Sequence, residues 1–223
     1  MKKGIKLVMF IGIGIIIFMK GFILNTARVR DEDLIVRILT RNEVISLYRF
    51  YGARHSYINI GYLIDFHIEE SVKTTIKRLR HVTQVPFKFL FDMQKTLYFK
   101  EYIRLLNKHF IGVSRVDSFY YDSLLKFCEN LSERDVKRAV IEHYVSLLEK
   151  EGRLHKDFIC FLCEGKIEGN IALARSFLPA HEKCVMSEGF EKEKLELLFN
   201  EKKTLLFSDE EIERLWRILE MGI

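Results

Sequence analysis

The sequence predicts an α+β protein in which a small antiparallel β-barrel is followed by a helical domain. Apolar and polar residues alternate along much of residues 19–92, which is the period of a half-buried strand. From 93 to 223, apolar residues recur every three or four positions, which is the period of a helix face. Cys and His residues gather in an insert at about 155–187, as in zinc-finger-like modules. Residues 1–18 form an apolar leader before the barrel.

The composition is that of a folded protein. The 223 residues are 48% hydrophobic and include only 2 Pro, which excludes long disordered tracts and leaves room for one large domain or two small ones. The sequence contains no internal repeat and no low-complexity segment. With 4 Cys, the chain is unlike a disulfide-stapled secreted domain. A Cys-x2-Cys pair indicates a metal or redox motif in a reducing compartment.

Three interpretations of the apolar leader stay open. Lysines precede an apolar run of 13 residues, Leu7–Met19, as in a signal peptide, but no convincing cleavage site follows. A membrane-spanning helix needs about 20 residues, so a tilted anchor would have to extend to Leu24. The third interpretation, which we favour, is that translation begins at Met19 and residues 1–18 are a dispensable extension.

The barrel region contains short alternating segments. In the segment after the acidic triplet Asp31–Asp33, the side chains of Leu34, Val36 and Ile38 share one face. Four or five strands within about 75 residues fit the oligonucleotide-binding (OB) barrel, although other small barrels fit the count too. The expected strands are 21–29, 33–40, 43–52, 58–68 and 72–78, with a further one at 87–91.

The helical region has its own start signals. Ser132-x-x-Asp135 is expected to cap one helix, and Ser208-x-x-Glu211 is a capping box at the start of the last helix. Cys128 falls on a helix face with apolar neighbours and is expected in the core. The predicted buried faces are Phe99, Ile103, Leu106 and Phe110; Val136, Val140, Tyr144 and Leu148; and Ile212, Leu215, Trp216 and Leu219.

Positive charge is concentrated in the barrel region. Residues 19–95 contain 13 Lys and Arg against 8 Asp and Glu, whereas residues 96–223 contain 20 against 23. A positive field on a small β domain attracts phosphate backbones. The charge distribution therefore indicates a nucleic-acid-binding protein.

Aromatic and basic residues interleave between residues 48 and 55. Bases of a single strand stack on rings and guanidinium planes, each contributing about 1–3 kcal/mol. Alternation assigns Tyr48 and Phe50 to the core, and Arg49 and Tyr51 to the face that meets nucleic acid. The alternative is that the arginines are only a solvated rim of the barrel.

A second basic run between residues 73 and 88 supports the same interpretation. Charge runs are usually solvated faces, but tracking a phosphate backbone requires several charges along one groove. The predicted DNA-binding residues are Arg28, Arg37, Arg49, Tyr51, Arg54, His55, Lys73, Lys77, Arg78 and Arg80.

Two ligand pairs, Cys160-x2-Cys163 and His181-x2-Cys184, are separated by 17 residues. Zinc takes four such ligands in a tetrahedron, and two short spacings can supply them. The site would be structural, because all four positions would be protein ligands. The alternative is that the two cysteines of the first pair are buried apolar residues and His181 is a helix cap.

The sequence carries no catalytic signature, and a non-enzymatic role is expected. It contains no phosphate-binding loop of the Gly-x4-Gly-Lys type, no His-Glu-x2-His and no Gly-x-Ser-x-Gly. The triplet Asp31–Asp33 has no second carboxylate cluster to pair with, so it is expected to be a charged hairpin edge.

Several segments resemble the RecO family in the form found in epsilon-type proteobacteria. The most specific is Tyr-Arg-Phe-Tyr-Gly-Ala-Arg-His-Ser at 48–56, preceded by Met-Lys-Gly-Phe-Ile-Leu-Asn-Thr at 19–26 and Asp-Glu-Asp-Leu-Ile-Val-x-Ile-Leu-Thr at 31–40. Glu-Gly-Arg-Leu-His at 151–155 and Ala-Leu-Ala-Arg-Ser-Phe-Leu-Pro-Ala-His-Glu-Lys-Cys at 172–184 are similar to the C-terminal half of the same group.

The resemblance implies an N-terminal OB fold, a helical C-terminal domain and a role in recombinational DNA repair through the RecFOR pathway. Such proteins bind single- and double-stranded DNA and anneal complementary strands without ATP. They engage RecR and the C-terminal tail of the single-strand-binding protein SSB, and they assist RecA loading. A cytoplasmic, nucleoid-associated protein without a nucleotide cofactor is implied, with the basic barrel face as the DNA surface.

The chain departs from the family pattern in two places. Relatives with zinc commonly use four cysteines, whereas here His181 replaces one, and the leader before Met19 has no counterpart. A function of another class is a membrane-anchored cytosolic scaffold whose basic face binds anionic lipid or protein partners. A zinc-dependent enzyme is disfavoured because the insert offers no obvious general base.

Overall fold

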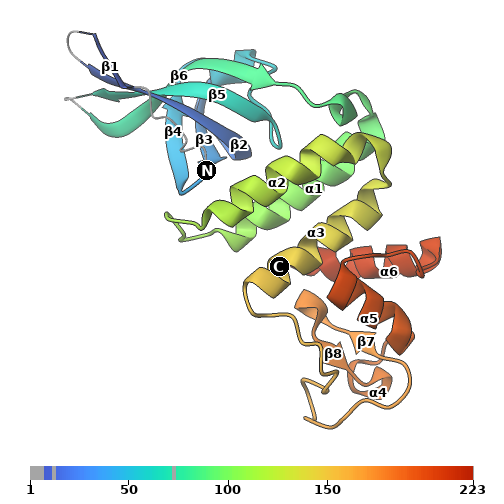
Figure 1. The fold of residues 1–223 in the computed structure, drawn as a ribbon. Coiled ribbons are helices and arrows are strands. Elements are labelled where there is room, and N and C mark those ends of the chain that lie inside the picture. Colours follow the sequence, from blue (N-terminus) through green and yellow to red (C-terminus); the bar gives the residue numbers. More distant parts are fainter. Residues whose placement is uncertain (1–7, 12–13, 72–73, 223) are drawn as a thin grey trace. The chain divides into compact units, whose positions relative to one another are not determined.

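The computed structural model describes residues 8–11, 14–71 and 74–222. The chain forms two compact units, Met1–Glu129 and Asn130–Ile223. The first unit contains the barrel and two helices, and the second contains the remaining helices and the Cys/His insert (Figure 1).

A closed barrel dominates the first unit. Its strands are β2 (Gly14–Arg30), β3 (Asp33–Leu39), β4 (Val44–Arg49), β5 (Leu63–Ser71) and β6 (Thr74–Val85). They follow the order β2-β3-β4-β6-β5, and pairing of β2 with β5 closes the ring. The contact between β4 and β6 is parallel, and the other barrel pairings are antiparallel. This arrangement is a five-stranded Greek-key barrel of the OB type, which confirms the predicted fold class.

A short strand lies beside the barrel. β1 (Val8–Ile11) pairs in antiparallel fashion with the beginning of β2, so part of the apolar leader is in a β-hairpin. The rest of the leader, residues 1–7 and 12–13, lies outside the described residues.

Inward-facing aliphatic and aromatic side chains fill the barrel. The predicted face of β3 is confirmed, because Leu34, Val36 and Ile38 are all buried in one cluster. β4 contradicts the prediction, because Leu47 is its fully buried member and Phe50 is 39% exposed. Ile45 and Leu47 are the aliphatic pair of this strand that packs in the barrel core, so the neighbouring Tyr48 and Phe50 point outward.

Several predicted strand limits are wrong, and one predicted strand is a helix. The strand expected at 21–29 is the longer β2, which begins at Gly14. The segment expected to begin a strand at Ile58 is a turn up to Tyr62, in which Gly61 has a φ of 85° and Tyr62 N–H donates to Asn59 O. The segment expected as a strand at 87–91 is instead the 3-10 helix η2 (Lys88–Phe91). The last strand of the barrel is the longer β6, which continues to Val85.

Helices α1 (Met93–His109) and α2 (Ser118–Asn130) complete the first unit. Asp92 caps α1 through Lys95 N–H, and the predicted apolar face of α1 is buried. Cys128 is 1% exposed, as predicted for a core residue. The ring of Phe22 on β2 lies 5.6 Å from that of Tyr121 on α2, so aromatic packing joins the helices to the barrel.

The second unit has a helical core. It contains η3 (Leu131–Glu133), α3 (Val136–Lys150), η4 (Arg175–Phe177), α5 (Lys192–Glu201) and α6 (Asp209–Glu220). The capping box of α6 is present as predicted. α3 begins differently, because the Asp135 side chain accepts from Arg138 N–H while Ser132 lies in η3. The predicted faces of α3 and α6 are buried.

The insert of the second unit has little regular structure. Its elements are the two-residue strands β7 (Ala172–Leu173) and β8 (Pro179–Ala180), the 3-10 turn η4 between them, and one helical turn, α4 (Glu182–Val185). Across both units, none of the helices in the described segments has the length and hydropathy needed to span a membrane.

The barrel core makes a stability prediction. Phe66 on β5 is 1% exposed, so Phe66→Ala is expected to lower the free energy of unfolding of the barrel by about 3–5 kcal/mol. Phe91, which is 90% exposed, supplies the matched control. Phe91→Ala should change the free energy of unfolding of the barrel by less than about 0.5 kcal/mol. Hydrogen exchange of barrel peptides measures both, and equal effects would contradict the assigned core.

Candidate nucleic-acid interface and metal site

Two of the predicted DNA-binding arginines hold the fold together. Arg49 pairs with the core residue Leu34 in the β3–β4 register, and its Nη1 donates to Leu79 O at 3.1 Å. Arg37 donates from Nη1 to the Asn107 side chain at 3.0 Å, and from Nη2 to the Phe110 carbonyl at the end of α1. Burial lowers the pKa of the Arg37 guanidinium. Both side chains therefore join segments of the first unit.

The basic residues of β6 lie among acidic partners. Lys77 Nζ is 2.6 Å from Glu70, and Arg80 Nε is 2.7 Å from Glu69. The hydrogen bond from Arg80 is the main reason that the pKa of Glu69 is lowered. Exposed ion pairs of this kind contribute only about 0–1 kcal/mol, so a phosphate can compete for the cations.

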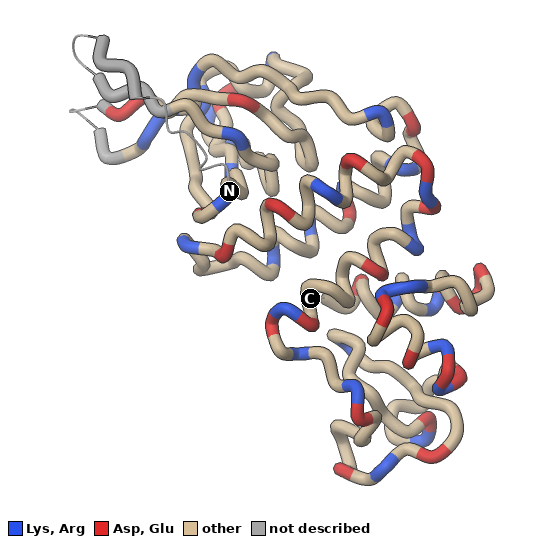
Figure 2. Tube along the Cα trace, viewed as in Figure 1, with Lys and Arg blue, Asp and Glu red and all other residues tan. Residues whose placement is uncertain are grey.

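Arg78 is placed differently from its neighbours on β6. It pairs with Tyr48 across the parallel contact to β4, and its guanidinium lies 5.3 Å from the ring centroid of Phe50. Figure 2 marks the Lys and Arg positions along the barrel strands. Lys73, also predicted to bind DNA, lies outside the described residues.

The turn after β4 carries the other predicted residues. Tyr51 is 58% exposed, and the Arg54 guanidinium lies 4.9 Å from its ring centroid. Arg54 also forms an ion pair with Glu32. His55 is half-buried and stacks on Tyr57 at 4.9 Å, and Arg28 is exposed near the end of β2.

Phe50 is an exposed aromatic residue that sequence reasoning assigned to the core. The signal that identifies it is the aliphatic pair Ile45 and Leu47, which sets the inward phase of β4 and places Phe50 on the outer face. The structure therefore places two ring–guanidinium pairs on consecutive aromatic residues, Arg78 with Phe50 and Arg54 with Tyr51, which are together called the cation–aromatic cluster.

The carboxylates of the acidic triplet Asp31–Asp33 do not gather into one site, because Glu32 and Asp33 have different partners. Glu32 pairs with Arg54, and Asp33 accepts hydrogen bonds from the Tyr48 hydroxyl and from Tyr51 N–H. Among the described residues, the metal-ligand types gather in groups of three or more only at the Cys/His insert.

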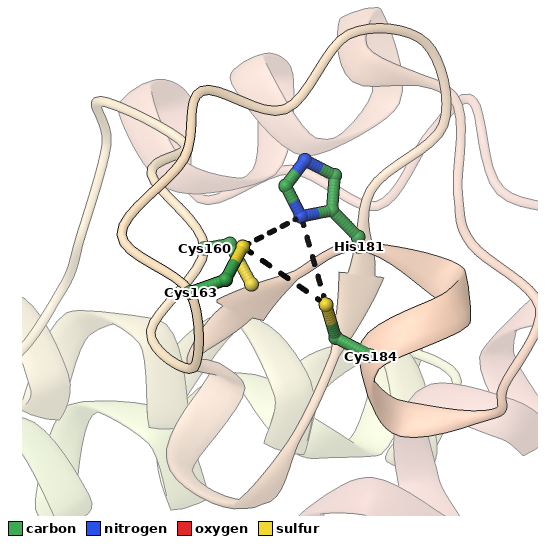
Figure 3. Close-up of side chains that lie close together, drawn as sticks. All are labelled: Cys160, Cys163, His181 and Cys184. Atoms are coloured by element: carbon green, nitrogen blue, oxygen red, sulfur yellow. Dashed lines mark hydrogen bonds between the residues drawn. The ribbon is translucent and has the colours of Figure 1, made fainter.

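The Cys/His insert brings its four predicted ligands together (Figure 3). The Sγ atoms of Cys160, Cys163 and Cys184 and a ring nitrogen of His181 all lie within 4.8 Å of one another. Cys163 Sγ is 3.3 Å from His181 Nδ1 and 4.0 Å from Cys184 Sγ, and Cys184 Sγ is 3.8 Å from the same nitrogen. Ligands of a tetrahedral ion with metal–ligand bonds of about 2.0–2.3 Å are separated by roughly 3.3–3.8 Å. The cluster could therefore hold a metal ion.

Local backbone geometry supplies the two ligand pairs. Cys160 N–H donates to Gly165 O at 2.9 Å and Glu164 N–H donates to Cys160 O at 2.8 Å, which folds the first pair into a tight knuckle. The second pair begins α4, where Cys184 N–H donates to His181 O. Phe161 N–H donates to Pro179 O and joins the two pairs.

The orientation of His181 suits a ligand. Its Nε2 lies 3.1 Å from the Lys166 carbonyl oxygen, which can only accept, so Nε2 carries the proton and Nδ1 directs its lone pair at the thiols. His181 is the N-cap residue of α4, but its side chain makes no capping hydrogen bond. The helix-cap alternative therefore does not account for the ring.

The pKa values of the Cys160 and Cys184 thiols are shifted in opposite directions. Burial raises the pKa of Cys160, but hydrogen bonds from the backbone N–H groups of His181 and Cys163 outweigh it and lower the value to about 6. Burial and the neighbouring Cys160 and Cys163 raise the pKa of Cys184 to about 11. The negative charge at Cys160 thus disfavours ionisation of the neighbouring Cys184 thiol. A metal cation at this point would remove that repulsion.

Residues 19–90 match the family model RecO N terminal. The match covers the closed barrel from within β2 to η2, and it includes every predicted DNA-binding residue. It spans about a third of the chain and ends before α1, so it does not extend to the Cys/His insert. No curated protein matches the chain.

The metal site makes a composition prediction. The chain, supplied with divalent ions under reducing conditions, should hold one ion, and Cys163→Ala should lose it. Cys128→Ala is the control, because Cys128 lies on α2 outside the cluster, and it should retain the ion. Elemental analysis after gel filtration measures this, and equal metal content in the two variants would contradict the site.

Proposed function

We propose that this protein is a RecO-like mediator of recombinational DNA repair, of the form found in epsilon-proteobacteria. The observation that carries the proposal is the match of residues 19–90 to the RecO N-terminal family model on a barrel with OB strand order. The positive charge of this region and its exposed cation–aromatic cluster support a nucleic-acid ligand.

In this proposal the barrel binds single- and double-stranded DNA. Arg28, Arg54, Lys77, Arg78 and Arg80 would contact phosphates, and the release of counterions would drive binding. Arg37 and Arg49 would act indirectly, by holding β3, β4 and α1 in place. Neutralising two phosphate backbones at one surface lowers their mutual repulsion, which would let complementary strands anneal without ATP.

The proposed role is non-catalytic and depends on protein partners. RecR and the C-terminal tail of SSB would bind directly, and RecA would load onto the SSB-coated strand that the complex exposes. Such a protein would work in the cytoplasm at the nucleoid. The support for these partners is the family likeness of the barrel.

We further propose that the Cys/His insert binds a structural zinc ion. Zinc favours three thiolates and one imidazole in a tetrahedron, and the four protein ligands would leave no open position for a substrate. Bound zinc would neutralise the thiolates and join the Cys160 knuckle to α4. The insert has little secondary structure of its own, so this crosslink would stabilise it.

DNA binding is tested by anisotropy of labelled single-stranded DNA across a salt series. We expect log K to fall with log salt by about 0.7 for each phosphate neutralised. Arg28→Ala/Arg54→Ala should therefore flatten the slope by about 1.4, while Lys192→Ala/Lys203→Ala, which removes the same charge from the second unit, should leave it unchanged. An absence of binding at low salt by the folded chain would refute the proposal.

The zinc proposal predicts a change in stability confined to the second unit. The only Trp of the chain, Trp216, is 3% exposed on α6, so its fluorescence follows unfolding of that unit. At free zinc 1,000 times above Kd, we expect the free energy of unfolding to rise by about 4 kcal/mol relative to the chelated protein. Hydrogen exchange of the barrel should not change, and a zinc-insensitive Trp216 transition would contradict a structural site.

A further inference from the structure

The chain turns sharply where β4 ends, and the turn exposes two consecutive aromatic rings. Phe50 and Tyr51 are 39% and 58% exposed. Tyr51 has a φ of 51°, in the left-handed region that a bulky residue rarely adopts. This conformation interrupts the alternation of the strand, so Tyr51 does not follow Arg49 toward the core.

The carboxylate of Asp33 fixes this turn. Its Oδ1 accepts from Tyr51 N–H at 2.7 Å, and its Oδ2 accepts from the Tyr48 hydroxyl at 2.5 Å. The Tyr48 ring in turn packs edge-on against Phe50, with centroids 4.8 Å apart. One carboxylate therefore determines the backbone of Tyr51 and, through Tyr48, supports the ring of Phe50.

The same hydrogen bonds keep Asp33 ionised. The bond from Tyr48, followed by that from Tyr51 N–H, lowers the pKa of Asp33 below its ordinary value. The stabilisation that these hydrogen bonds give the fold is fully present above the pKa that Asp33 has in the unfolded chain. It is lost as the pH falls through the lowered pKa of Asp33 in the folded state. The carboxylate therefore holds the turn at neutral pH.

A second set of contacts makes the turn rigid. Gly52 lies so close to Leu34 that an added Cβ would be 2.9 Å from its side chain. Ala53 N–H donates to Glu32 O at 2.9 Å, and Arg54 pairs with the Glu32 side chain. The backbone that carries both rings is thus fixed before any ligand arrives, which limits the entropy lost on binding.

We infer that Phe50 and Tyr51 form a platform on which bases of a single strand stack, with Asp33 as its positioning residue. This inference rests on the proposed function and specifies its ligand as unpaired bases. Each ring has a guanidinium within 5.3 Å, Arg78 for Phe50 and Arg54 for Tyr51. A base can stack on the ring or on the guanidinium plane while the cation meets the phosphate. Bases inside a duplex already stack on each other, so the platform favours single strands.

The test compares oligo-dT with an abasic strand of equal length and charge, using the full chain and anisotropy. The wild type should bind oligo-dT more tightly. Phe50→Ala and Tyr51→Ala should each weaken oligo-dT binding roughly 5- to 150-fold and change abasic binding less than about twofold. Val29→Ala, at a 50% exposed aliphatic residue of β2, is the control and should change neither.

A spectroscopic readout tests contact directly. Tyr51→Trp adds an indole on the platform, while the native Trp216 is 3% exposed in the other unit. Oligo-dT should quench the added emission and the abasic strand should not. Unquenched emission on binding of oligo-dT would overturn the contact at Tyr51.

Two further variants test whether Asp33 positions the rings. Asp33→Ala should weaken oligo-dT binding and spare abasic binding, and Tyr48→Phe, which removes only the hydroxyl, should reproduce part of this loss. Equal weakening of both strands by Asp33→Ala would overturn its positioning role.

The outcomes for the wild type separate the two proposals. Equal affinity for oligo-dT and the abasic strand would overturn the platform and leave phosphate binding intact. Binding of neither strand at low salt would overturn the proposed function itself.

Discussion

Closure of the barrel by the pairing of β2 with β5 determines most of what the first unit can present to a ligand. With the ring closed, each strand has one face inside and one outside, and Leu47 occupies the inside on β4. Tyr48 and Phe50 are then necessarily outside. The parallel contact of β4 with β6 places Arg78 beside Tyr48, so the contact of Arg78 with the Phe50 ring follows from the strand order.

The Cys/His insert rests on different interactions. Its ligands are positioned by the Cys160 knuckle, by the start of α4 and by the hydrogen bond of Phe161 N–H to Pro179 O, all within the second unit. The family match ends at residue 90, so the barrel and the insert are supported by independent observations. The electrostatics also differ, because a positive surface attracts phosphates whereas clustered thiolates require a cation.

Local patterns in the sequence predict the features that local interactions decide. The inward face of β3, the capping box at Ser208 and the four clustered ligands depend on spacing within short segments, and all are found as expected. Features that depend on distant partners were missed. Arg49 is drawn in by a carbonyl on β6, and Arg37 by the end of α1. The sequence does not show which face of β4 is buried, because the aromatic residues of this strand are as apolar as its aliphatic ones. The segment that forms η2 resembles a strand in its composition alone.

We propose that the outer face of the barrel around Phe50 and Arg78 binds single-stranded DNA. Photocrosslinking of the full chain to a bromouracil-substituted oligonucleotide, followed by peptide mass spectrometry, tests it most directly. Crosslinks are expected in residues 48–55 and in β6. Crosslinks confined to residues 130–223 would contradict it and would place the DNA site in the second unit.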